Sequence, residues 1–290
     1  MRRSSLGKRL FVSPSCNGFL FPISWFCNEQ FLNLEKLRTM FRMSVEIVKH
    51  FQARNLSEES QSYIRTHAKR YAFLLEKVSM LAAGLNQRPP ITFLDIGPSF
   101  FTELLRVSFP QDKIMTLGYD FPESRGGHFP MDTAHDNRQH FHFNLNDAQF
   151  PDRYISTPPA DIAIMAEVIE HLYTAPTLVL RFVRTLIRSG GFLIVETPNP
   201  ASLKKRLKLL WGKHPYEMIR ENVENPGHFR EYTKGELCTI AKSAGFEVSG
   251  CELSNYFSHD SSKASILRLL RSHGPSSLRR GITMILRKPV

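Results

Sequence analysis

Short apolar runs alternate with amphipathic helical stretches from residue 91 to the end of the chain, and each run leads into a polar or glycine-containing turn. A strand buried on both faces reads as an unbroken apolar run, and the helix between two such strands covers the sheet. The alternation therefore predicts an α/β fold with a mostly parallel sheet. The predicted strands are 91–94, 113–119, 141–145, 161–166, 192–197, 246–253 and 281–287, and the predicted helices between them are 99–109, 176–187, 201–210, 233–244 and 265–272.

The N-terminal region divides into two segments. Residues 43–90 are predicted to be helical, because Ser57 can cap a helix and apolar residues then recur at three- and four-residue spacing. Residues 1–42 form a basic extension that we expect to be poorly ordered and dispensable for function. Three explanations of this extension stay open: a transit peptide, a poor secretory signal, or sequence ahead of a start at Met43.

The positive charge is concentrated at the two ends of the chain. The formal net charge is +11, of which residues 1–42 contribute +5 and residues 263–290 contribute +7, so the middle is close to neutral at −1. Basic ends can bind nucleic acid or anionic lipid. We favour a solvated surface and a poorly ordered tail as the explanation.

Two further features of the sequence bear on the cellular compartment in which the protein is expected. The sequence holds no run of 18 apolar residues, which excludes an ordinary membrane-spanning helix. Its four cysteines are widely spaced, so a disulfide framework or a structural zinc site is not expected. We therefore expect a reducing compartment, the cytoplasm.

The turns after the strands hold the residues best suited to ligand binding, because parallel sheets bind ligands at the carboxyl ends of their strands. Asp95 and Gly97 follow the first strand, and glycine lets the backbone approach a ligand closely. Asp120 ends the second strand, where an acid can accept both hydroxyls of a ribose. Asn144 and Leu145 end the third strand, in a position to frame an adenine edge.

Seven short segments follow one another in a fixed order. They are LDIG at 94–97, GYD at 118–120, FNLND at 143–147, ADIAIMAEVIEHL at 160–172, SGGFLIVETPN at 189–199, HFREYTKGEL at 228–237 and AGFEV at 244–248. Each alone is a weak signal, but their order and spacing together are specific. Over roughly 91–248 the chain resembles class I S-adenosylmethionine-dependent methyltransferases of the small-molecule type 11/23 kind.

The resemblance implies a Rossmann-like, doubly wound sheet of seven strands, mostly parallel with an antiparallel C-terminal strand, after an N-terminal helical extension. It places the methyltransferase domain at 91–290, with an insertion around 200–230 that shapes the substrate site. The basic helix at 201–210 in this insertion suits an acidic or phosphorylated acceptor, and a solvated helix face explains it equally.

The resemblance also implies that S-adenosylmethionine is the methyl donor. Asp95 and Gly97 would lie against its methionine part, and Asp120 would hold its ribose. Asn144 and Leu145 would contact the adenine.

The chain departs from the glycine-rich loop of the family. The family pattern is acid-x-Gly-x-Gly-x-Gly, but here Ser99 and Phe101 replace the second and third glycines. Ser99 is small and can lie near a backbone turn, so we still expect it to border the cofactor. The same departure argues against a nicotinamide site, because the GxGxxG fingerprint is missing. Glu167 lies where the fourth strand would meet cofactor and substrate.

The expected reaction needs positioning and, for a hydroxyl acceptor, removal of a proton. Histidine is the natural base near neutral pH. His171, after the fourth strand, or His228, beside the family's substrate pocket, is the expected base. Arg230 and Tyr232 are expected to contact the substrate or to fix the fold. A purely structural role for each histidine stays open.

We expect no metal site. The histidines between 128 and 142 match no known metal-ligand spacing, and a polar loop explains that segment better.

The function expected from the sequence is methyl transfer to a small molecule or glycan, at oxygen. One alternative is a non-catalytic scaffold with a methyltransferase fold, which the degenerate glycine loop favours. Another is a nucleic-acid methyltransferase, which the basic ends favour. The near-neutral middle, without an Asn/Asp-Pro-Pro-Tyr/Phe-type segment after the fourth strand, argues against nucleic acid. Membrane contact through the helix at 265–272 stays open, and the oligomeric state is not predicted.

Overall fold

The computed structural model describes residues 34–85, 90–118, 139–222, 226–256 and 274–290. Their strands form one seven-stranded sheet in the order β3-β2-β1-β4-β5-β7-β6. Within these residues β7 runs antiparallel to both of its neighbours, and the other pairings are parallel. The predicted fold class is therefore confirmed. The strands are β1 (Thr92–Ile96), β2 (Lys113–Gly118), β3 (His140–His142), β4 (Ala160–Ala166), β5 (Ile187–Pro198), β6 (Glu247–Ser254) and β7 (Gly281–Arg287).

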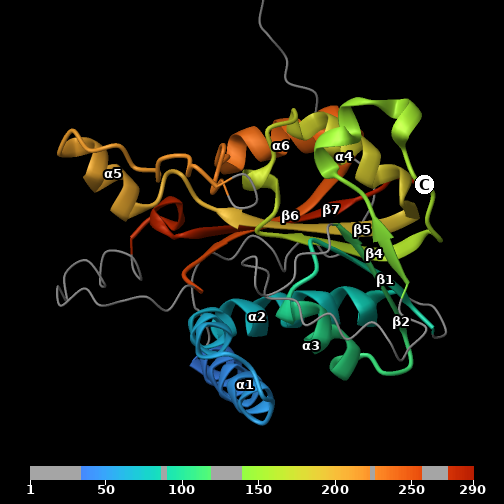
Figure 1. Cartoon of the computed structure of the whole chain (residues 1–290), viewed down its shortest axis with the longest axis horizontal. Coiled ribbons are helices and arrows are strands. Elements are labelled where there is room, and N and C mark those ends of the chain that lie inside the picture. Colours follow the sequence, from blue (N-terminus) through green and yellow to red (C-terminus); the bar gives the residue numbers. More distant parts are fainter. Residues whose placement is uncertain (1–33, 86–89, 119–138, 223–225, 257–273) are drawn as a thin grey trace, which may run out of the picture. The chain divides into compact units, whose positions relative to one another are not determined.

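Helices cover both faces of the sheet (Figure 1). One layer contains α1 (Leu34–Gln52), α2 (Glu58–Gly84) and α3 (Phe100–Ser108), and the other contains α4 (Pro176–Thr185) and α6 (Lys234–Ser243). The helix α5 (Leu203–Leu210) projects beyond the end of the sheet. The remaining elements are 3₁₀ turns: η3 (Leu145–Gln149), η4 (Pro151–Arg153), η5 (Ile169–His171) and η6 (Ser276–Leu278).

The central strands serve both layers because successive side chains point to opposite faces. In β1, Phe93 belongs to the cluster with α1, α2 and α3, whereas Leu94 belongs to the cluster with α4 and α6. In β4, Ile164 and Met165 divide in the same way. This explains why the strands read as continuous apolar runs in the sequence.

The predicted boundaries differ from the structure most at three places. The strand predicted at 141–145 is the shorter β3, and Leu145 already belongs to η3. The helix α1 runs without a break across residue 42, so helical structure begins inside the segment expected to be a poorly ordered extension. The Gly190–Gly191 pair does not precede β5 but lies within it, because Ile187 already pairs with Ala160 and the register shifts before Ile162. The helix expected at 265–272 falls outside the described residues.

No helix in the described ranges is both long and apolar enough to cross a bilayer.

The turn after β1 is closely packed against the turn after β4. Gly97 has a φ of 76°, and a Cβ atom at this position would lie 2.5 Å from Cγ2 of Val168. Gly97 is thus required by the left-handed backbone and by the neighbouring side chain.

We predict that Gly97→Ala lowers the free energy of unfolding by roughly 1–3 kcal/mol, through backbone strain and the clash with Val168. Gly235→Ala is the matched control, because Gly235 lies in α6 with open space around its Cα and should lose no stability. Urea denaturation measures both. Equal stabilities for the two variants would contradict this account.

Candidate active site

The carboxyl ends of β1 and β4 lie side by side at the point where the strand order reverses. Open α/β sheets bind their ligands outside this switch point. The structure brings four predicted site residues to it: Asp95, Gly97 and Ser99 after or at the end of β1, and Glu167 directly after β4.

On the β1 side, a capping box fixes the start of α3. The Ser99 hydroxyl accepts a hydrogen bond from the Phe101 N–H at 3.2 Å, and the Thr102 hydroxyl accepts one from the Ser99 N–H at 3.0 Å. Thr102 in turn donates to the Asp95 carboxylate at 2.5 Å. Burial raises the pKa of Asp95 to about 7, and the bond from Thr102 opposes this rise.

Packing of the aromatic side chains after β1 explains why this loop is not rich in glycine. Phe101 stacks on Tyr71 of α2, with ring centroids 5.9 Å apart, and Phe100 contacts Tyr63 of α2 and Phe51 of α1. The aromatic side chains thus join the N-terminal helices to the loop after β1.

On the β4 side, Glu167 holds a backbone conformation that is uncommon for a residue with a side chain. Its φ is 56°, and its N–H donates to the Glu196 carbonyl at 2.8 Å. Its Oε1 is buried and has no hydrogen-bond partner among the described residues. Burial raises the pKa of Glu167, and the positive charge of Arg70 opposes that rise. Backbone strain of this kind clusters at functional sites.

Arg70 of α2 and Glu196 of β5 complete a charged layer between the helix and the sheet, and neither residue was predicted from the sequence. The Arg70 side chain is 3% exposed, and its Nη1 lies 3.5 Å from Oε2 of Glu196. Burial raises the pKa of Glu196 to about 8, with Arg70 acting in the opposite direction. Two signals were available: Arg70 lies seven residues after Tyr63 on the apolar face of its helix, and Glu196 interrupts the apolar run of β5.

The two predicted histidines meet in the structure. The rings of His171 and His228 are in edge contact, with centroids 4.7 Å apart. Nδ1 of His171 lies 2.9 Å from the Gly227 carbonyl, and Nδ1 of His228 lies 3.2 Å from a carboxylate oxygen of Glu231. Since both partners accept, each Nδ1 carries a proton, and in the neutral form of each ring the lone pair lies on Nε2. Burial and the neighbouring His228 lower the pKa of His171.

Glu170 holds the segment of His228 against η5. The backbone carbonyl of Glu170 accepts hydrogen bonds from the N–H groups of Phe229 at 2.8 Å and Arg230 at 3.3 Å. Its fully buried side chain accepts a bond from the Thr197 hydroxyl at 3.0 Å. Burial, and then the charge of Glu167, raise the pKa of Glu170 well above its usual value.

The sequence left two roles for Arg230 and Tyr232: contact with the substrate, or stabilisation of the fold. Their contacts in the structure suit the second role. Arg230 pairs with Glu236 at 2.7 Å on the surface, and Tyr232 is buried in the core with α4 and α6. Their contact with substrate stays a prediction.

The residues expected at the adenine lie at the end of β3. The Asn144 side chain caps η3 by accepting from the Asn146 N–H at 2.9 Å, and Leu145 is buried. Asp120, expected at the ribose, lies outside the described residues.

The residues at the switch point fit an amino-acid-bearing nucleoside such as S-adenosylmethionine. The unpartnered Oε1 of Glu167 and the buried carboxyl of Asp95 offer acceptors for an ammonium group. A left-handed glycine at the turn gives the backbone access that such a ligand needs.

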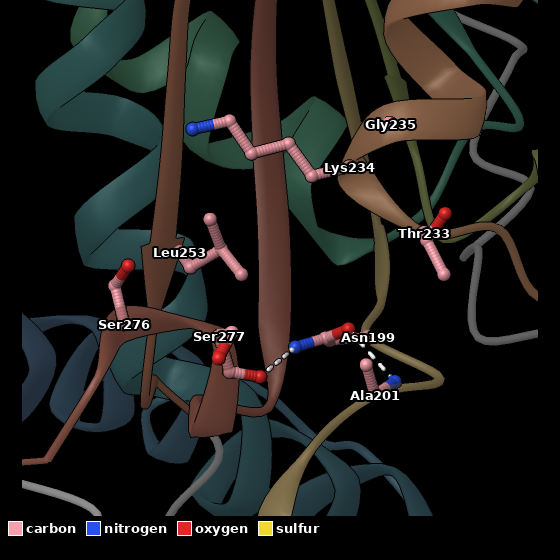
Figure 2. Close-up of a pocket in the computed structure, with 8 residues that line it drawn as sticks. All are labelled: Asn199, Ala201, Thr233, Lys234, Gly235, Leu253, Ser276 and Ser277. Atoms are coloured by element: carbon pink, nitrogen blue, oxygen red, sulfur yellow. Dashed lines mark hydrogen bonds between the residues drawn. The ribbon is translucent and has the colours of Figure 1, made fainter.

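A cavity of about 310 Å³ lies further along the same edge, beyond β5 (Figure 2). The side chain of Asn199 forms one wall, where it bonds the carbonyl of Ser277 and the N–H of Ala201. Most of the polar lining is uncharged. The lining residues are Asn199, Ala201, Thr233, Lys234, Gly235, Leu253, Ser276 and Ser277.

We predict that Asp95→Asn flattens the dependence of stability on pH. Asp95 binds its proton more tightly in the folded chain, at a pKa of about 7 against a usual 3.8. Its contribution to stability is therefore present below about pH 4 and lost as the pH rises through 7, by at most about 1.4 kcal/mol per pH unit. Urea denaturation between pH 4 and 8 measures this.

The exposed Asp152 provides the control, since Asp152→Asn should keep the pH profile of the wild type. If wild type and Asp95→Asn showed identical pH profiles, ionisation of Asp95 would not lower the stability of the folded chain.

The comparisons with known proteins agree with this geometry. The profile of a family described as "Methyltransferase domain" matches residues 65–249, which is more than half of the chain. A Mycolicibacterium smegmatis protein described as "Probable S-adenosylmethionine-dependent methyltransferase" is 34% identical over 107 residues, covering 37% of this chain and 34% of its own length. The ubiquinone biosynthesis O-methyltransferase of Aeromonas salmonicida is 28% identical over 116 residues, covering 38% of this chain and 45% of its own.

Two solved structures show the same fold. One is the methyltransferase in complex with the Trm112 activator of Haloferax volcanii, with a TM-score of 0.52 at 11% identity, covering 84% of this chain and 98% of that one. The other is the plantazolicin methyltransferase BamL, with a TM-score of 0.50 at 13% identity, covering 89% and 100%. The matched segment spans less than half the length of the curated relatives above. The chain belongs to the methyltransferase-domain family of class I S-adenosylmethionine-dependent methyltransferases.

Proposed function

We propose that this chain transfers a methyl group from S-adenosylmethionine to a hydroxyl oxygen of a small molecule or glycan. The observation that carries the proposal is the contact between His171 and His228 after β4, at the edge of the sheet where the cofactor residues lie. When bound, the sulfonium supplies an electrophilic methyl group.

Different residues around the switch point would bind different parts of S-adenosylmethionine. Asp95, Gly97, Ser99 and Glu167 take the methionine part, and Asp120 takes the ribose. Asn144 and Leu145 border the adenine. These assignments follow the family's motifs, and the burial of Asp95 and the unpartnered oxygen of Glu167 support them.

The histidine pair removes the proton from the acceptor. Proton transfer needs a lone pair on an imidazole nitrogen, and hydrogen bonding of Nδ1 to Gly227 and Glu231 assigns that lone pair to Nε2 in the neutral form of each ring. A lowered pKa keeps His171 neutral at pH 7. Arg230 and Tyr232 then support the loop that carries His228.

The cavity beyond β5 gives room for the rest of a bulky acceptor. Its serine, threonine and lysine side chains suit a ligand rich in hydroxyl groups. Assignment to oxygen is also supported by the Aeromonas relative, which is named as an O-methyltransferase.

The scaffold alternative rests on the replacement of two glycines in the loop after β1. The structure offers a different explanation for these two replacements. Ser99 caps α3 and Phe101 stacks on Tyr71, so both replacements serve the packing of α2 on the loop. Loss of glycine here does not require loss of binding.

Calorimetric titration with S-adenosylmethionine tests the donor site. We expect Gly97→Arg and Asp120→Ala to weaken binding at least about tenfold, which is 1.4 kcal/mol, because each removes a contact to a different part of the cofactor. Gly84→Arg is the control, because Gly84 is exposed at the end of α2 with open space around its Cα, and this variant should bind as the wild type. Thermal melts show which variants are folded. A folded wild type that binds no S-adenosylmethionine at millimolar concentration would favour the scaffold alternative.

Methyl transfer to sugars, phenols and quinols tests the histidine pair. We expect His171→Gln and His228→Gln to lower kcat about 10²–10⁴-fold while the affinity for S-adenosylmethionine stays the same. His214→Gln is the control, because His214 is exposed and contacts only its own loop among the described residues. Full activity in both single variants would exclude the pair as the base.

A further inference from the structure

We propose that Glu170, His171 and His228 form a binding site for one divalent transition-metal cation, such as Mn²⁺ or Zn²⁺. This differs from the sequence-based expectation of no metal. The binding of the cation is independent of methyl transfer, but its use in holding the acceptor oxygen rests on the function proposed above.

The three side chains converge on one point from two segments. Each offers one ligand atom, and these atoms all lie within 4.8 Å of one another. Three ligands on one ion with bonds of about 2.0–2.2 Å lie at most roughly 3.8 Å from one another, because about 120° is the widest angle that three ligands can share. Side-chain shifts of up to about 1 Å therefore complete the site.

Hydrogen bonds to the other ring nitrogens orient both histidines for a metal. Histidine ligands usually donate their second ring N–H to a backbone carbonyl or a carboxylate, which fixes the tautomer. His171 makes the first kind of bond, to Gly227, and His228 makes the second, to Glu231. The carboxylate of Glu231 is itself fixed by an ion pair with Lys205.

The carboxylate of Glu170 is only partly satisfied by hydrogen bonds. One carboxylate oxygen accepts the hydrogen bond from Thr197, while Oε1 is buried with no hydrogen-bond partner in the described part of the chain. Glu170 is fully buried, and an unpaired buried carboxylate is costly. A cation beside Oε1 would satisfy it.

The donor set indicates the class of metal. Two imidazoles and one carboxylate suit Mn²⁺, Fe²⁺, Co²⁺ or Zn²⁺ better than Mg²⁺ or Ca²⁺, which prefer oxygen alone. Three protein ligands leave positions open for other oxygens. A hydroxyl at such a position would have a lowered pKa and would lose its proton to water. In the metal-loaded protein the histidines are therefore ligands, and the base role proposed above applies to the metal-free protein.

Metal titration of chelator-treated full-length protein tests the site directly. Co²⁺ is the spectroscopic probe, through its visible absorption, and equilibrium dialysis with Mn²⁺ or Zn²⁺ gives the stoichiometry. We expect one equivalent bound by the wild type, and at least a tenfold loss of affinity in His171→Gln, His228→Gln and Glu170→Gln. His214→Gln is the control and should bind as the wild type.

Two results would overturn the proposal: no stoichiometric binding by folded wild type, or unchanged binding in the His171→Gln and His228→Gln variants. These two half-buried positions serve as the test if Glu170→Gln does not fold.

The experiments distinguish failure of the metal-site proposal from failure of the proposed function. Metal binding without S-adenosylmethionine binding would sustain the site and reject the proposed function. S-adenosylmethionine binding and undiminished methyl transfer in chelator-treated protein would sustain the function and reject the metal as its participant.

Discussion

The buried carboxyl group and backbone carbonyl of Glu170 tie together three parts of the chain that are distant in sequence. The carbonyl accepts from Phe229 and Arg230, the side chain accepts from Thr197 at the end of β5, and η5 itself continues β4. Together with the hydrogen bond from His171 to the Gly227 carbonyl, this junction fixes the segment that carries His228 relative to η5. The geometry of the candidate site therefore depends in large part on one residue whose charge is expensive to bury.

The charged layer under α2 follows the same principle. Arg70, Glu167 and Glu196 are withdrawn from solvent, and burial raises the pKa of both carboxyl groups while Arg70 opposes it. Buried charges with perturbed pKa values gather at functional sites more often than in ordinary cores. Here they lie at the carboxyl edge of the sheet, beneath the helices that the aromatic residues Phe100 and Phe101 connect to the loop after β1.

The sheet could be predicted from the sequence because its central strands are buried on both faces and appear as separate apolar runs. The switch-point positions of Asp95, Gly97 and Glu167 could be predicted for the same reason, since each follows such a run. The contacts between segments could not. Nothing local in the sequence places Gly227 beside His171 or Arg70 beside Glu196, because these pairs are formed by tertiary packing. The extent of β5 was also missed, because its paired glycines resemble a turn.

The ion pair between Lys205 and Glu231 has a mechanical consequence. Lys205 belongs to α5, which projects beyond the sheet, and Glu231 holds the ring of His228. Burial acts to raise the pKa of Glu231, but His228 and Lys205 together hold it below its usual value. A ligand that moved α5 outward would withdraw the ammonium group of Lys205 and leave the Glu231 carboxylate with the hydrogen bond from His228 alone. The position of α5 is thereby coupled to the orientation of a histidine ring at the centre of the site.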